Sequence, residues 1–382
     1  MRSAVTYLKS WFGRFDAVRQ RRPDPWLWLP ATVLIMLGCL MVLNTTYFMS
    51  QEKTGDAFHF FKLHLLHLAV GMLMLMALSQ FSLRGLRRLV IPLAVISVAM
   101  LLALHVPHLG ITRGGARRWL RLGPYVCEPV EFAKLAVVFF LAEFLSKRED
   151  RIRLLNQGPI PAFVFVAPVA LLTLTQPDLG NTVMIALVLF VMLYAAGAQV
   201  KHLGVAGVGG ICILVLQTMA KSYRMRRMTA FLHPWETARG AGFQLIQSFI
   251  ALGTGGGLGV GLGEGRQKMH FLPEAHTDFI FAVVGEEFGI IGGVIVVALF
   301  GVILFRGMKI AHDEPDGFAS LLAVGLTASL SFQAFINMAM VIGLIPTKGL
   351  PLPFLSYGGT AIMMSMAALG ALLALGRRPA VR

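Results

Sequence analysis

Residues 233–289 read HPWETARGAGFQLIQSFIALGTGGGLGVGLGEGRQKMHFLPEAHTDFIFAVVGEEFG, and they contain the longest polar interruption in a chain that is otherwise mostly apolar runs. The stretch is rich in glycine, basic residues, amides and carboxylates, and Asp278 stands where another apolar run begins. Ionisable groups kept beside membrane-length apolar runs are costly and tend to mark functional positions. We therefore expect recognition or chemistry in this loop.

The composition places the chain in a membrane class. Hydrophobic residues make up 56% and charged residues 14% of the 382 residues, and the mean hydropathy is +0.72. Soluble domains average about 45–50% apolar and about 25% charged residues. Several runs approach the ~20 residues that cross a bilayer as a helix, and they are continuous rather than alternating as in a transmembrane barrel. The sequence predicts an all-α, polytopic integral membrane protein.

The apolar runs predict about ten transmembrane helices, with a large extracytoplasmic loop, 221–277, between the seventh and the eighth. The expected spans are 27–48, 61–79, 88–106, 127–146, 161–176, 181–198, 203–220, 278–306, 317–344 and 358–376. They form one domain, 27–376, between cytoplasmic tails at 1–26 and 377–382. Residues 1–25 are too charged for a cleavable signal peptide, so the first span is expected to remain as an anchor.

The net charge of +15 is informative once it is placed relative to the bilayer. Cations gather in both tails and in the even-numbered connections, so the positive-inside rule makes that side cytoplasmic. The charge then requires no nucleic acid partner. The residues are Arg2, Lys9, Arg14, Arg19, Arg21, Arg22, Arg84, Arg87, Arg88, Lys147, Arg148, Arg151, Arg153, Lys201, Arg306, Lys309, Arg377, Arg378 and Arg382.

Two loops on the other side break this rule, namely 107–126 and 221–277. Long loops are translocated regardless of charge, which accounts for the second loop but not for the shorter first one. Cations confined to two outer loops indicate an anionic ligand there, such as a phosphate or pyrophosphate. The candidate ligands are Arg117, Arg118, Arg227 and Lys268.

Span four contains two ionisable residues, Glu131 and Lys134, which are spaced to share a helix face. Lys134 lies about 10 Å inside the span by the helical rise, and Glu286 and Glu287 lie at a similar distance inside span eight. Charged groups at such depth face the protein interior and find partners. We expect Lys134 to pair with Glu286, or less favourably with Glu287.

Asp278 admits two interpretations. In the first, Thr277 caps span eight and Asp278 favours the helix dipole in the first turn. In the second, Asp278 is a general base at the boundary between water and membrane, facing a basic loop. The dipole would lower its pKa and partial burial would raise it. Glu264 and Glu274 are the other candidate acids.

Two segments of the large loop have local signatures. The glycines of 253–265 resemble a phosphate-binding loop, but no GK[ST] follows, so an irregular or re-entrant segment with positive φ angles is the simpler interpretation. Residues 243–253, which include Gln247, place apolar residues at helical spacing and predict an amphipathic helix at the membrane interface.

Three further features are expected near the outer face or between helices. In QPDLGN (176–181), Asp178 either caps a turn or lines an outer cavity. The prolines of 345–360 exclude a regular helix and predict a rigid plug near that cavity. Gln333 and Asn337 are expected to hydrogen-bond neighbouring helices.

Together these motifs resemble the SEDS family of bacterial cell-wall proteins, which comprises FtsW, RodA and their sporulation relatives. The resemblance covers about residues 27–376 and rests on GARRWLRLG with EFAKL, QPDLGN, GFQLIQSFIALGTGG, FLPEAHTDFIFAVVGEEFG and KGLPLPFLSYGGT. EAHTDFIFAV, TKGLPLP and the QK at 267–268 are most similar to the FtsW branch. The chain departs from the family pattern at Cys127-Glu128-Pro129-Val130, where a Gln-Pro-Ser version is common, and at Thr360, where Ser is common.

The resemblance implies a peptidoglycan glycosyltransferase that polymerises lipid II during cell division, in the bacterial inner membrane at the septum. It implies a class B penicillin-binding protein (an FtsI-like transpeptidase) and other divisome proteins as partners. Asp278 matches the family's catalytic acid, and the residues expected to contact substrate are Arg117, Arg118, Arg227, Lys268, Gln247 and His276. A divalent cation, Mg²⁺ or Mn²⁺, is a possible cofactor, although Cys39, Cys127 and Cys212 show no metal-ligand spacing.

Two other classes stay open at this point. A lipid II flippase would suit ten spans with intramembrane charges, but it needs charged groups along a route through the membrane. A non-catalytic scaffold would not need Asp278. The concentration of polar groups near the outer face favours chemistry at that face.

Overall fold

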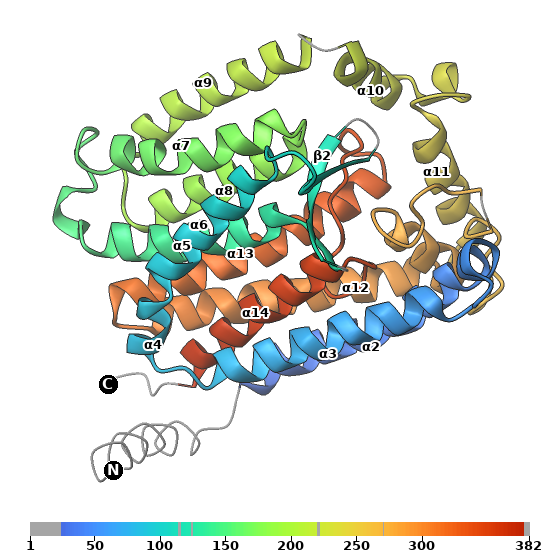
Figure 1. Cartoon of the computed structure of the whole chain (residues 1–382), viewed down its shortest axis with the longest axis horizontal. Helices are drawn as coiled ribbons and strands as arrows, with labels where there is room; N and C mark the ends of the chain where they lie inside the picture. The colour runs from blue at the N-terminus through green and yellow to red at the C-terminus, as the bar shows by residue number, and fades with distance from the viewer. Residues whose placement is uncertain (1–23, 114–115, 124, 220–221, 270, 378–382) are drawn as a thin grey trace.

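The computed structural model describes residues 24–377 except 114–115, 124, 220–221 and 270 (Figure 1). The helices of the bundle run lengthwise beside one another, and a small sheet lies at one end (Figure 1). The longer helices are α2 (Pro25–Thr54), α3 (His59–Ser79), α5 (Val90–Ala103), α6 (Pro129–Ser146), α7 (Pro159–Thr175), α8 (Leu179–Ala195), α9 (Val200–Met219), α10 (Ser222–Leu232), α11 (Phe243–Gly255), α12 (Ile280–Asp313), α13 (Gly317–Val341) and α14 (Gly359–Gly376). Short helical segments are α4 (Leu83–Arg88), η1 (Glu149–Arg151) and η2 (Pro234–Thr237).

The membrane class predicted from composition is confirmed. Seven helical segments in the described part of the chain are long and apolar enough to cross a bilayer. Each of the ten expected spans coincides with a helix, or with α4 and α5 together. However, α7 and α8 have only 17 residues each, and α6 contains three charged residues. The count of ten spans therefore stays a prediction.

The core lies around α13 and α14. Both are apolar on nearly every face, which is typical of helices surrounded by other helices. Helix α14 packs along α3, and α13 packs on α6, α8 and α12. In contrast, α9 has almost no buried residues and lies at the edge of the bundle (Figure 1).

At one end of the bundle, ion pairs connect the ends of several helices. Arg306 of α12 pairs with Asp24, which caps α2. Arg87 pairs with Glu143 at 2.9 Å and with Asp316 at 3.5 Å. We call this the capped end and the opposite one the sheet end. The connections predicted to be cytoplasmic at α3–α4, α6–α7 and α12–α13 thus lie together, as the charge pattern requires.

The sheet is a feature that the all-α prediction missed. Strands β1 (Gly110–Arg113), β2 (Ala116–Leu122) and β3 (Tyr125–Cys127) form an antiparallel sheet in the order β1-β2-β3. The pairing of β1 with β2 is irregular: the register shifts between Ile111, which pairs with Trp119, and Thr112, which pairs with Arg117. The β2 sequence ARRWLRL does not alternate apolar and polar residues, so it carries no period-2 strand signal.

Helix α12 consists of two helical segments joined at Gly289, whose φ of 66° and ψ of −165° interrupt the helix. The glycine-rich loop fills the interruption: Val260 N donates to Glu286 O at 3.0 Å and Ile290 N donates to Gly256 O at 2.9 Å. Irregular backbone in a membrane protein requires such internal partners. The prediction of an irregular segment with positive φ angles is confirmed, since Gly256, Gly259, Gly261 and Gly263 all have them.

Candidate active site

Asp278 lies at the sheet end, directly before α12, and its side chain is partly buried. The capping interpretation is wrong, because α12 begins at Ile280, its first turn holds no acid, and no side chain caps it. Thr277 instead donates its hydroxyl to Glu274 Oε2 at 2.9 Å. Burial, and to a smaller extent Glu274, raise the pKa of Asp278 to about 7, although Arg118 and Arg227 act in the opposite direction. A carboxyl with such a pKa exchanges protons near neutral pH.

Arg118, on β2, links the sheet to the α7–α8 turn. Its Nη2 donates to Pro177 O at 2.6 Å, and its Nε lies 3.7 Å from Asp178 Oδ2. Asp178 is buried and caps α8 by accepting a hydrogen bond from Asn181 N at 3.1 Å. The capping interpretation of Asp178 is confirmed, whereas its place in an outer cavity stays a prediction.

The 342–358 segment between α13 and α14 forms the opposite wall of this site. A Cβ at Gly349 would stand 3.2 Å from Asp278 Oδ2 and 4.0 Å from Arg118 Nη1, so the glycine lies against both groups. Lys348 is partly buried, and burial lowers its pKa while Asp178 raises it. The prediction that the prolines exclude a regular helix is confirmed for 342–358, and the role of this segment as a rigid plug stays a prediction.

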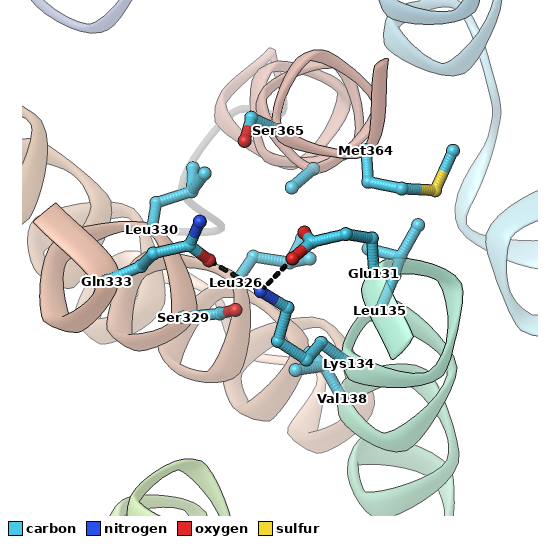
Figure 2. A pocket seen from close by; sticks show the side chains of 11 residues that line it. Glu131, Lys134, Leu135, Val138, Leu326, Ser329, Leu330, Gln333, Met364 and Ser365 are labelled. Atoms are coloured by element: carbon cyan, nitrogen blue, oxygen red, sulfur yellow. Dashed lines mark hydrogen bonds and ion pairs between the residues drawn. The ribbon is translucent and has the colours of Figure 1, made fainter. Parts of the chain in front are cut away.

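The predicted ion pair between Lys134 and Glu286 or Glu287 is wrong. Lys134 Nζ donates to Glu131 Oε1 at 2.6 Å and to Gln333 Oε1 at 2.7 Å, in a pocket between α6, α13 and α14 (Figure 2). The predicted pairing assumes that the outer ends of α6 and α12 lie at the same level. Counted from the capped end, Lys134 lies about 18 Å along α6, but the Gly289 break lies about 36 Å along α12. Helix α12 extends further towards the sheet end than α6 does. Glu286 and Glu287, which precede the break, therefore lie nearer to the sheet end than Lys134.

Lys268 is the partner of Glu287. Its Nζ donates to Glu287 Oε1, Asn44 Oδ1 and Gly263 O, each at 2.6 Å, and its side chain is 1% exposed. An ammonium has three donors, and all are used. The prediction of Lys268 as a substrate ligand is therefore corrected to an interior ion pair.

The Glu286 carboxylate binds backbone N–H groups of the residues that directly follow the glycine-rich loop. It accepts hydrogen bonds from Arg266 N at 2.8 Å and from Gln267 N at 3.2 Å. Its neighbour Glu287 accepts one from Asn44 Nδ2 at 2.6 Å. The two adjacent carboxylates thus fasten the glycine-rich loop to α12 and α2.

The remaining predicted ligands occupy different surroundings. Arg117 Nη2 donates to Val106 O at 2.7 Å, so this guanidinium binds the backbone of the segment between α5 and β1. Arg227, on α10, is partly buried and close enough to lower the pKa of Asp278. The ring of His276 lies 5.8 Å from that of Tyr357, and burial lowers the pKa of His276. Gln247 is partly buried on α11, a helix that packs along α12. Glu264 and Glu274 are exposed.

Glu128 is a site residue that sequence reasoning passed over. It precedes α6, and its N–H donates to Thr360 Oγ1 at 3.0 Å, so the two departures from the family pattern touch. Burial raises the pKa of Glu128 to about 8, with Glu131 and Asp178 raising it and Lys134 and Arg118 lowering it. The sequence does contain a signal for Glu128, because this residue belongs to a segment that departs from the Gln-Pro-Ser version common in the family.

Within the described ranges, no group of three or more His, Cys, Asp or Glu side chains could hold a metal ion. Mg²⁺ usually binds through one or two carboxylates together with substrate phosphates and water. The divalent cation therefore stays a prediction.

The fold and the site define a class: a polytopic helical membrane protein whose partly buried acids and arginines meet at one end of the bundle. Residues 25–379 match the family model described as Cell cycle protein, which covers FtsW, RodA and SpoVE, and the chain belongs to this family. The resemblance seen in the motifs is confirmed.

Relatives are similar over nearly their whole length. A probable peptidoglycan glycosyltransferase FtsW of Geobacter sp. strain M18 is 40% identical, with 91% of this chain and 95% of the relative covered. Stage V sporulation protein E of Bacillus subtilis strain 168 is 39% identical, with 94% and 98% covered.

Solved structures have the same fold. One, described as the structural coordination of polymerization and crosslinking by a peptidoglycan synthase complex, is 30% identical with a TM-score of 0.75, and 93% of this chain and 98% of that chain are covered. The rod shape determining protein RodA of Thermus thermophilus is 27% identical with a TM-score of 0.69, covering 93% and 97%.

Proposed function

We propose that this protein is a peptidoglycan glycosyltransferase that polymerises lipid II into glycan strands during cell division. The observation that carries the proposal is Asp278, a partly buried carboxyl with a pKa of about 7 beside Arg118. Relatives that match along their whole length are named for this activity. The sheet end is then the extracytoplasmic end, in agreement with the positive-inside rule.

In the reaction, the 4-hydroxyl of the acceptor sugar attacks the anomeric carbon of the donor, with inversion. The new bond joins the acceptor oxygen to that carbon, and the bond from the carbon to the pyrophosphate breaks. The pyrophosphate leaves with the electron pair. Asp278 takes the hydroxyl proton as the attack proceeds, which is general base catalysis.

The leaving pyrophosphate carries the developing negative charge, so cations must face it. Arg118, Arg227 and Lys348 are the cations placed around Asp278 or Asp178. A divalent cation brought by the pyrophosphate would supply further charge stabilisation.

The expected setting is the bacterial inner membrane at the division septum. The similar peptidoglycan synthase complex combines polymerization and crosslinking, which supports a class B penicillin-binding protein of the FtsI type as the partner of this chain. FtsW-named relatives support the divisome and its other proteins as the context. The substrate is an undecaprenyl pyrophosphate-linked lipid, which a site at the membrane boundary can receive sideways.

The deciding experiment is lipid II polymerisation by the purified protein in complex with its cognate transpeptidase. The wild-type complex should form glycan strands. Asp278→Asn should insert and bind the partner normally but polymerise roughly 10²-fold more slowly, the scale of general base catalysis. Polymerisation by Asp278→Asn at a near wild-type rate would remove Asp278 from the mechanism.

A further inference from the structure

The backbone that carries Asp278 is held at three consecutive carbonyls. Tyr357 N donates to His276 O at 2.8 Å and Ser356 Oγ donates to Thr277 O at 2.5 Å. Asn337 Nδ2 donates to Asp278 O at 2.7 Å. No regular helix or strand contains these three acceptors, because α12 begins only at Ile280. Tertiary contacts therefore fix the direction in which the Asp278 carboxyl points.

The two side-chain donors are themselves fixed. Ser356 and Asn337 are both buried, and Asn337 is fully so. Asn337 Nδ2 also donates to Leu350 O at 2.7 Å, and Ser356 Oγ accepts a hydrogen bond from Leu352 N at 2.8 Å. The Asn337 amide nitrogen uses both of its protons, while Asn337 Oδ1 is buried with no hydrogen-bond partner among the described residues. The Ser356 hydroxyl both donates and accepts. Rotation of either group would leave buried backbone carbonyls unpaired, so both donors keep one geometry.

The loop is also anchored one helical turn away. Gln333, four residues before Asn337 on α13, donates through Nε2 to Pro351 O at 2.9 Å. Its Oε1 accepts from Lys134, which is paired with Glu131 (Figure 2). The buried ion pair thus orients the Gln333 amide, and the amide holds the loop.

We propose that Ser356 and Asn337 are positioning residues, which hold the Asp278 carboxyl at the place where it can accept the proton of the attacking hydroxyl. This inference rests on the proposed role of Asp278 as the base. A displacement of about 1 Å at a reacting group can cost 10²-fold in rate. Gly349, on the same loop, packs against Asp278 Oδ2, so a movement of the loop moves both the backbone and the wall of the site.

The test compares Ser356→Ala and Asn337→Leu with wild type in the polymerisation assay of the purified complex. Each variant removes the donor and nearly preserves the volume. We expect kcat to fall about tenfold, with KM for lipid II changed less than about twofold, because the bound substrate is untouched. Ser320→Ala is the matched control. It removes a hydroxyl that donates to Ala311 O at 2.7 Å, toward the capped end, and should keep wild-type kinetics.

The same substitutions are then made in the Asp278→Asn background. A positioning residue acts through Asp278, so Ser356→Ala should leave the residual rate of Asp278→Asn unchanged within about twofold. An equal fold-loss in both backgrounds, or no loss in either, would overturn the proposal. A wild-type rate for Asp278→Asn alone would instead overturn the base assignment. If Asn337→Leu does not fold, Ser356→Ala decides, because it removes a single oxygen.

Discussion

The pH dependence of polymerisation should report the environment of Asp278. Its pKa is raised to about 7 by burial, with Glu274 acting in the same direction. A base works in its deprotonated form, so kcat/KM should rise with pH and level off above 7. About half of the sites are ionised at pH 7 and about one tenth at pH 6, so the rate at pH 6 should be roughly tenfold below the plateau. A carboxyl with its ordinary pKa near 4 would give no change between pH 6 and pH 8.

The assay is kcat/KM for lipid II with the purified complex, because this parameter reports groups of the free enzyme. Two variants test whether the pH profile of kcat/KM depends on Asp278 in the expected direction. Glu274→Gln removes a carboxylate that raises the pKa of Asp278, so the rise should move to lower pH. The residual rate of Asp278→Asn should lose the dependence near pH 7. A flat wild-type profile from pH 6 to 8, or a Glu274→Gln profile displaced to higher pH, would refute the reasoning.

Three further predictions concern single interactions. Arg118→Gln removes a cation that lowers the pKa of Asp278, so the rise in kcat/KM should move to higher pH. The plateau of kcat/KM should fall about tenfold or more, because the leaving pyrophosphate loses a cation. An unchanged pH profile would contradict this role of Arg118. Lys268→Met leaves the buried Glu287 without its ion-pair partner and should lower the free energy of unfolding in detergent by about 3–5 kcal/mol. Lys62→Met, at the exposed pair with Asp56, should have a much smaller effect. Similar losses for the two variants would argue against an interior pair. Glu128 is protonated below its pKa of about 8, so Glu128→Gln should keep the polymerisation rate within about threefold of wild type at pH 7. The variant should also abolish any decline in the wild-type rate above pH 8. A large loss of rate at pH 7 would show that the charged form of Glu128 matters.

The candidate site illustrates which assignments a sequence supports. Asp278 follows the polar loop and matches a family motif, and these local features predict its role; the structure excludes the alternative role as a cap. The position of Lys268 in a basic loop predicts a ligand contact. The structure shows the opposite, since the lysine points inward to Glu287. Charge in a loop does not indicate the direction of a side chain, and burial does.

The sequence by itself determined the membrane class, the positions of the helices and the family, because hydropathy over about 20 residues and local motifs are properties of contiguous segments. It also identified the glycine-rich segment as irregular, since positive φ angles favour glycine. Only the tertiary structure decided which partners meet. Lys134 binds Gln333 across 199 positions of the chain, and Lys268 binds Asn44 across 224. Such pairs depend on how far each helix extends from the capped end of the bundle. In α12 the break at Gly289 also affects where Glu286 and Glu287 lie relative to the other helices. The raised pKa of Asp278 has the same origin, because burial is set by the segments that fold over a residue and not by its neighbours in sequence.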